Sequence, residues 1–104
     1  MHEDMILEEA KRRLVLELKP SKVYLFGSRA RGTASSTSDY DFYVVMPSAD
    51  ERPFRRTQRA YRALRGLSIS KDVVVGTDER FDRMKNVVSS LEHEVASEGV
   101  LLYG

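Results

Sequence analysis

A short polar spacer in the first half of the chain limits the folds that this sequence can adopt. Residues 22–26 and 40–46 read as β-strands, because aromatic and β-branched residues dominate them and Gly27 and Pro47 end them. Only residues 27–38 join the two strands, whereas parallel neighbours need a crossover that usually contains a full helix. If the strands are neighbours, the sequence therefore predicts an antiparallel pair, in which the end of the first strand lies beside the start of the second.

The rest of the chain alternates between helical and strand patterns. Apolar residues recur every third or fourth position in residues 4–18 and 78–97, which predicts one helix in each segment. A further helix is predicted over residues 50–65, a strand over 69–75 and a short strand over 100–103. This alternation predicts an α/β fold with a small mixed β-sheet packed against helices.

The predicted connections bring three short motifs to one edge of the sheet. The second and third strands are joined through a helix, as in a parallel βαβ unit, so both begin at the same edge. The first strand ends there with the Gly-Ser pair at 27–28, and the second begins there with the Asp-x-Asp pair at 39–41. Asp72 lies at the start of the third strand. We therefore expect the three motifs to converge on one site.

Three carboxylates at this edge would repel one another unless cations lie between them. Residues two apart in a strand face the same side, so Asp39 and Asp41 would project together, and Asp72 would lie one strand spacing away, about 4.8 Å. Such a cluster suits two Mg²⁺ ions, which prefer oxygen ligands and often bind few carboxylates together with substrate phosphates. Gly27 would let the backbone approach a phosphate closely, and Ser28 would offer a hydroxyl group and an N–H.

Two cations follow the Gly-Ser pair directly. Arg29 and Arg31 lie in the spacer and could neutralise the negative charge of a phosphate held beside Ser28. The combined pattern indicates a site for a nucleoside triphosphate and its metal ions, at which a nucleophile attacks a phosphorus atom in line.

The helix predicted over residues 50–65 contains six arginines. One interpretation is an ordinary solvated face, and the near-neutral charge of the whole chain favours it. The other is a docking surface for an acidic partner or for RNA.

The composition excludes several classes of protein. The net charge of +1 argues against a nonspecific nucleic-acid binder, and we do not expect direct binding to nucleic acid. The absence of cysteine excludes disulfides and cysteine-based metal sites. No apolar run approaches the length needed to cross a membrane. We expect a single domain over residues 1–104 and a cytoplasmic protein without a membrane partner.

The Gly-Ser pair at 27–28, the ten-residue spacer and the Asp-x-Asp pair at 39–41 resemble the signature of the DNA polymerase beta–like nucleotidyltransferase superfamily. More narrowly, the stretches GSRARG and SDYDF are similar to those of the minimal nucleotidyltransferases. Asp72, in the run KDVVV, matches the third carboxylate of that family. The tail EGVLLY at 98–103 also resembles the usual ending of such proteins. The resemblance covers most of the chain, from about Val23 onward.

The resemblance implies a role for each of these residues. Gly27 and Ser28 would hold the triphosphate of the substrate, ATP. Asp39 and Asp41 would bind both Mg²⁺ ions. Asp72 would complete the site, either as a metal ligand or as the base for the attacking hydroxyl group.

The resemblance also implies a partner. Minimal nucleotidyltransferases are often encoded beside a HEPN-domain protein, typically a ribonuclease toxin, and act as its antitoxin; some transfer AMP from ATP onto a tyrosine of that toxin. We therefore expect an adenylyltransferase that acts as the antitoxin of a HEPN-domain toxin. Two alternatives stay open: a module that neutralises its partner by contact alone, and a nucleotidyltransferase that acts on a small molecule such as an antibiotic.

Overall fold

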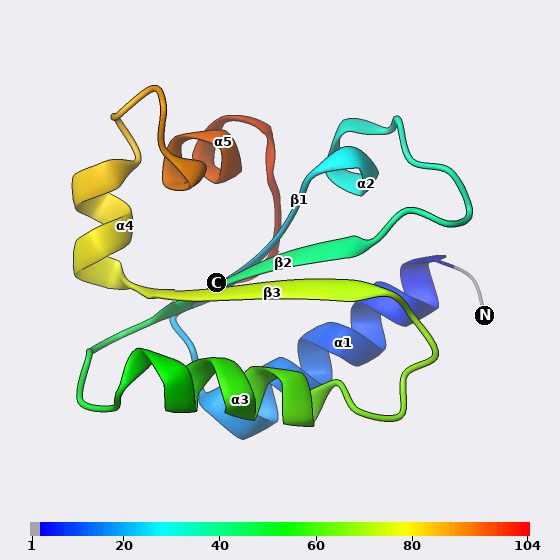
Figure 1. Ribbon diagram of the computed structural model, residues 1–104, viewed down its shortest axis with the longest axis horizontal. Helices are drawn as coiled ribbons and strands as arrows, with labels where there is room; N and C mark the ends of the chain where they lie inside the picture. Colours follow the sequence, from blue (N-terminus) through cyan, green and yellow to red (C-terminus); the bar gives the residue numbers. More distant parts are fainter. Residues whose placement is uncertain (1–2) are drawn as a thin grey trace.

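The computed structural model describes residues 3–104, so the first two residues of the domain predicted over 1–104 lie outside the described part. Within that part, helices cover both faces of one four-stranded sheet (Figure 1). No helix in it is long and apolar enough to cross a membrane. In chain order the elements are α1 (Glu3–Leu18), β1 (Lys22–Phe26), α2 (Ser28–Arg31), β2 (Tyr40–Met46), α3 (Pro53–Ala63), β3 (Lys71–Thr77), α4 (Asp78–Met84), α5 (Leu91–Glu98) and β4 (Val100–Tyr103).

The sheet is mixed and has the strand order β3-β2-β1-β4. β1 pairs antiparallel with β2, so that Phe26 lies opposite Asp41. β2 pairs in parallel with β3 through α3, and this register sets Asp41 opposite Asp72. β4 adds antiparallel to the other side of β1. The predicted α/β fold, the antiparallel first pair and the βαβ unit are therefore confirmed.

The central strand β2 is buried on both faces, because side chains alternate across a strand. Phe42 and Val44 pack in a core that contains side chains of α1 and α3. Tyr43 and Val45 pack in a second core, with side chains of α4 and α5. Figure 1 shows α1 and α3 on one side of the sheet and α4 and α5 on the other. Burial of a large apolar side chain contributes about 1.5–3 kcal/mol, so the two cores hold β2 firmly in place.

The helix predicted over residues 78–97 is in fact two helices, and the prediction was wrong at this point. α4 ends at Met84, and α5 begins after Ser90, whose hydroxyl group caps it by accepting a hydrogen bond from the His93 amide at 3.0 Å. The same hydroxyl group donates to the Met84 carbonyl at 2.7 Å. Apolar spacing continues across the break, but Val88 is 80% exposed and does not pack in the core.

Two other boundaries differ from the prediction by a few residues. The helix predicted over 50–65 begins at Pro53, whose fixed φ suits the first helical position. The strand predicted over 69–75 spans residues 71–77, because the parallel ladder with β2 continues to Thr77. The Thr77 side chain then caps α4 by accepting a hydrogen bond from the Arg80 amide at 3.2 Å.

Candidate active site

The Gly-Ser turn lies directly against the second aspartate of the motif. Gly27 has a φ of 76°, a left-handed value that glycine adopts without strain. A Cβ atom at this position would overlap Oδ2 of Asp41, so only glycine allows this approach. The amides of Ala30 and Arg31 donate to the Gly27 carbonyl at 3.1 Å each and start the one-turn helix α2. The half-buried Ser28 hydroxyl group has no hydrogen-bond partner within residues 3–104.

Asp41 is a half-buried carboxylate among like charges. Its side chain makes no hydrogen bond to the described part of the chain. Burial raises its pKa, and the nearby carboxylates of Asp72, Asp39 and Glu94 raise it further, while Arg31 opposes them. Asp41 is therefore the carboxylate of this edge that would gain most from a bound cation.

The other two aspartates are held by neighbouring hydroxyl groups. The Ser70 hydroxyl donates to Oδ1 of Asp39. The Tyr61 hydroxyl, on α3, donates to Oδ1 of Asp72 at 2.9 Å and accepts a hydrogen bond from the Val73 amide at 3.0 Å. Accordingly, no three acidic, histidine or cysteine side chains among residues 3–104 are gathered closely enough to hold a metal ion as they stand.

The donor set nevertheless fits Mg²⁺. All three candidate ligands are carboxylates, and hard oxygen donors are what this ion prefers. Asp39 and Asp72 are exposed, so each can turn toward Asp41 by rotation of its side chain. Burial raises the pKa of Asp41, the carboxylates of Asp72 and Asp39 raise it further, and a nearby cation would offset their repulsion.

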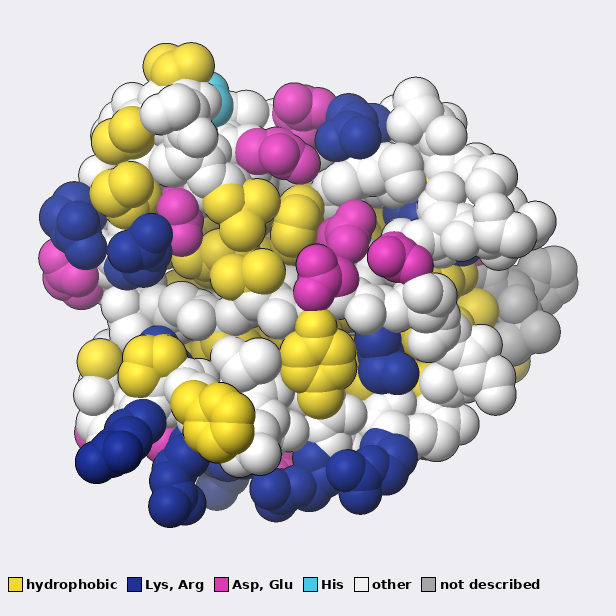
Figure 2. Space-filling model, in the orientation of Figure 1, with side chains coloured by type: hydrophobic (Ala, Val, Ile, Leu, Met, Phe, Trp, Pro, Cys, Tyr) yellow, Lys and Arg dark blue, Asp and Glu magenta, His cyan; other side chains and the backbone are white. Residues whose placement is uncertain are grey.

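Figure 2 shows acidic side chains together near the centre of one face of the molecule, above α3. The three aspartates therefore lie at one edge of the sheet, as expected. Their carboxylates do not form the close cluster that strand geometry alone suggested.

The two spacer arginines differ in their contacts. The Arg29 guanidinium donates to the Ser38 carbonyl at 2.9 and 3.2 Å and lies 3.9 Å from the centre of the Tyr40 ring. These contacts favour a role in holding the spacer loop, and phosphate binding by Arg29 stays a prediction. Arg31 lies at the exposed rim of the site, 3.5 Å from Glu94. It is free to reach a phosphate if that ion pair opens.

Sequence reasoning missed the groups that orient the aspartates. The helical pattern over residues 50–65 gave no sign that Tyr61 contacts Asp72, and Ser70 and Glu94 carried no recognisable pattern. The helical connection between β2 and β3 was the only usable signal for a contact between Tyr61 and Asp72, because a crossover helix must pack beside the strand that follows it.

A polar network centred on the buried Glu92 joins β2 to α4 and α5. Tyr43, two residues after Asp41 in β2, donates to Oε2 of Glu92 at 2.7 Å, and Nε of Arg80 lies 3.2 Å from the same oxygen. Burial opposes ionisation of Glu92, but the hydrogen bonds from Tyr43 and Arg80 lower its pKa overall. The network fixes α5 to the sheet.

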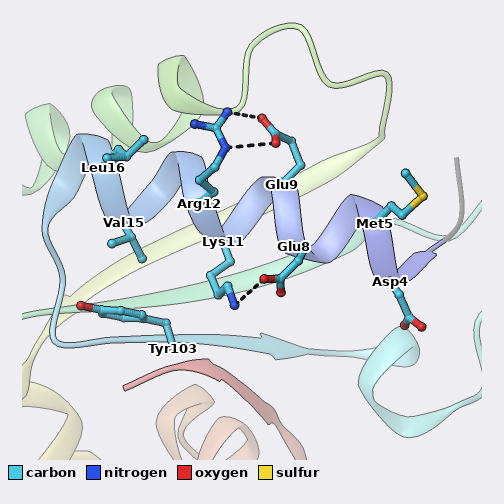
Figure 3. Close-up of a pocket in the computed structure, with 9 residues that line it drawn as sticks. All are labelled: Asp4, Met5, Glu8, Glu9, Lys11, Arg12, Val15, Leu16 and Tyr103. Carbon is cyan, nitrogen blue, oxygen red and sulfur yellow. Dashed lines mark hydrogen bonds and ion pairs between the residues drawn. The ribbon is translucent and has the colours of Figure 1, made fainter.

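A large open hollow, about 980 Å³, lies away from this edge, between α1 and the end of β4 (Figure 3). Its wall is mainly apolar and includes Met5, Leu16 and Tyr103. The cations on its rim, Lys11 and Arg12, are paired with carboxylates one turn earlier on α1. Because none of the motif residues lines this hollow, we place the candidate site at the aspartates and not at the hollow.

The chain as a whole is similar to one protein family and to several solved structures. A family model described as a nucleotidyltransferase domain matches residues 4–96. A solved candidate nucleotidyltransferase from Sulfolobus solfataricus is 30% identical, with a TM-score of 0.64, over 94% of this chain and 79% of its own. No curated protein shows significant similarity to the chain.

Two toxin–antitoxin structures share the fold. One, with AMP-PNP, is 23% identical, with a TM-score of 0.62, over 93% of this chain and 73% of its own. The other, a mutant of the MntA-HpeT toxin–antitoxin with two aspartates changed to glutamate, is 20% identical, with a TM-score of 0.57, over 100% and 74%.

Proposed function

Because the chain belongs to the nucleotidyltransferase domain family, we propose that it transfers AMP from ATP, with Mg²⁺, onto a hydroxyl group of a protein acceptor. One observation carries the proposal. Gly27 of the phosphate-holding turn packs directly on Asp41, which lies opposite Asp72 in the parallel ladder. This contact puts the turn and the carboxylates within reach of one substrate.

The residues divide the work as follows. The Gly27 backbone and the free Ser28 hydroxyl group hold the triphosphate. Asp39, Asp41 and Asp72 would hold Mg²⁺, which would supply charge neutralisation at the phosphates and at the leaving pyrophosphate. The acceptor oxygen forms a bond to the α-phosphorus while the bond to the pyrophosphate oxygen breaks, and Asp72 is placed to take the proton of the acceptor if it is not occupied as a ligand.

We further propose that the acceptor is a tyrosine of a HEPN-domain toxin and that the chain is its antitoxin. Two of the structural neighbours are toxin–antitoxin proteins, and one of them holds AMP-PNP, a non-hydrolysable analogue of ATP. The all-oxygen site and the free hydroxyl group beside it suit a nucleotide with its metal ions.

The test uses ATP labelled at the α-phosphate, Mg²⁺, this protein and the product of the adjacent gene. The double variant Asp39→Asn with Asp41→Asn should abolish transfer of label. The matched control, Asp50→Asn with Asp82→Asn, changes the charge equally at exposed positions and should keep it. Label on a partner tyrosine, located by mass spectrometry, would support the proposal. Inhibition of the partner without label, in the wild type and the double variant alike, would replace it with contact-only neutralisation.

A further inference from the structure

The outer face of α3 and the start of β3 carry cations without acidic partners. Arg55, Arg62, Arg65 and Lys71 form no ion pair within residues 3–104. By contrast, every lysine and arginine of α1 and α4 lies within 4.0 Å of a carboxylate. The net charge of +1 hides this difference between the helices. Figure 2 shows Lys and Arg side chains gathered along the lower edge of the molecule, over α3.

Three of these cations, Arg62, Arg65 and Lys71, line a groove of about 430 Å³. No acidic side chain lines it, and its wall includes Phe54, Tyr61, Arg62, Arg65 and Lys71. Phe54 is 70% exposed although it stands on a helix with a well-defined buried face. A cationic groove with an exposed aromatic ring has the composition of a binding surface, whereas an ordinary solvated face would intersperse charges of both signs.

The groove opens directly at the candidate active site. Tyr61 forms part of its wall and also donates a hydrogen bond to Asp72 at 2.9 Å. Lys71 precedes Asp72 in β3 but projects from the opposite face of the strand, so Tyr61 is the residue that links the groove to Asp72. A chain that occupies the groove therefore passes within one side chain of the carboxylate at which the acceptor would react.

We propose that this groove is the docking surface for an acidic segment of the protein that receives the nucleotide. The inference rests on the proposed function and adds how the acceptor is recognised. Charge complementarity carries it: the cations gain partners only when an anionic segment binds. A nucleic acid fits less well, because the net charge of +1 argues against binding to a continuous phosphate backbone.

The first test measures binding without ATP. The probe is a fluorescein-labelled peptide of glutamate and glycine around a single tyrosine, and its control has glutamine in place of glutamate. The variant Arg62→Gln with Arg65→Gln should weaken binding of the acidic peptide about 2–30-fold at low salt, as expected for the loss of two exposed ion pairs. The matched control Arg12→Gln with Arg83→Gln removes the same charge from paired positions and should leave the affinity unchanged.

Three results would overturn the inference. These are equal affinity for the acidic and the glutamine peptide, equal loss of affinity in both double variants, or displacement of the acidic peptide by a lower concentration of oligouridylate than of unlabelled peptide. None of these measurements needs catalysis, so their outcome is separate from failure of the proposed function, which would appear as wild-type protein that transfers no label. In an active enzyme, the groove variant should raise KM for the protein acceptor and leave KM for ATP unchanged.

Discussion

Replacing Asp41 with asparagine should stabilise the protein in metal-free buffer. Asparagine keeps the shape of the side chain and removes its charge. The half-buried Asp41 carboxylate makes no hydrogen bond to residues 3–104, so the substitution removes repulsion without breaking an observed contact. Asp39 and Asp72 differ, because each accepts a hydrogen bond from a neighbouring hydroxyl group.

The expected gain follows from the register of the sheet. Asp41 lies opposite Asp72, and neighbouring strands are about 4.8 Å apart. Two unit charges at that distance repel by about 0.9 kcal/mol at a dielectric constant of about 80 and by about 3.5 kcal/mol at about 20. Since Asp72 is exposed, solvent screening puts the gain near the lower value, at about 1 kcal/mol. For a domain of this size, that gain corresponds to a rise in Tm of about 4–8 °C.

The stability gained by Asp41→Asn should depend on pH, and the direction of the pKa shift of Asp41 sets the direction of that dependence. The folded-state pKa of Asp41 is raised, so the wild-type protein is penalised at high pH, where this carboxylate must ionise. The advantage of Asp41→Asn is therefore full above the raised folded-state pKa. It disappears as the pH falls below the ordinary aspartate value of about 3.9, where the carboxyl group is protonated in both states.

Thermal unfolding followed by circular dichroism, in EDTA at neutral and acidic pH, measures both effects. Asp82→Asn, at an exposed position beside Lys85, serves as the control and should not raise Tm. Addition of Mg²⁺ should raise the Tm of the wild type and close its gap to Asp41→Asn. An Asp41→Asn variant with no higher Tm than the wild type at neutral pH would contradict the predicted repulsion at Asp41. An undiminished difference in Tm at acidic pH would contradict it as well.

Three further predictions concern contacts around the site. Gly27→Ala should lower the free energy of unfolding by about 1–3 kcal/mol in urea titrations and abolish transfer, since a Cβ atom there meets Asp41 at a left-handed φ; an unchanged midpoint would contradict this. Tyr61→Phe keeps the ring but removes the hydrogen bond to Asp72, so kcat should fall about threefold to tenfold and its pH profile should shift, whereas an unchanged profile would make Tyr61 purely structural. Tyr43→Phe should lower the free energy of unfolding by about 1–3 kcal/mol at neutral pH by removing a donor to the buried Glu92. Because the folded-state pKa of Glu92 is lowered, the stability from this network is present above the ordinary carboxyl pKa and is lost as the pH falls through the lowered value, so the effect of Tyr43→Phe should shrink in acid.

The sequence predicted best where strong local signals coincide. β1 and β2 have the predicted bounds, because each is a compact apolar run ended by glycine or proline. The short spacer between them is the feature that predicted their antiparallel pairing, and the structure has that pairing. The break between α4 and α5 was missed, since periodicity cannot register a cap such as Ser90 when apolar spacing continues beyond it.

Side-chain orientation at the site could not be predicted in the same way. The sequence brought Asp39, Asp41 and Asp72 to one edge, but their directions depend on partners from distant segments. Tyr61 is 11 residues from Asp72, and Ser70 is 31 from Asp39. Such contacts arise from how α3 packs beside β3, and no local pattern encodes them.

Asp41 lies opposite Asp72 in the parallel ladder of β2 and β3, so the native alignment of these strands sets two like charges against each other. A slip of β3 by one residue could set Lys71 opposite Asp41, which would exchange a repulsion for an attraction. The same slip would turn the buried Val73 out of its core, and this loss of apolar burial keeps the native alignment in place. A cation bound between the aspartates would remove this repulsion, so cation binding would favour the native register of β3 over the misaligned one.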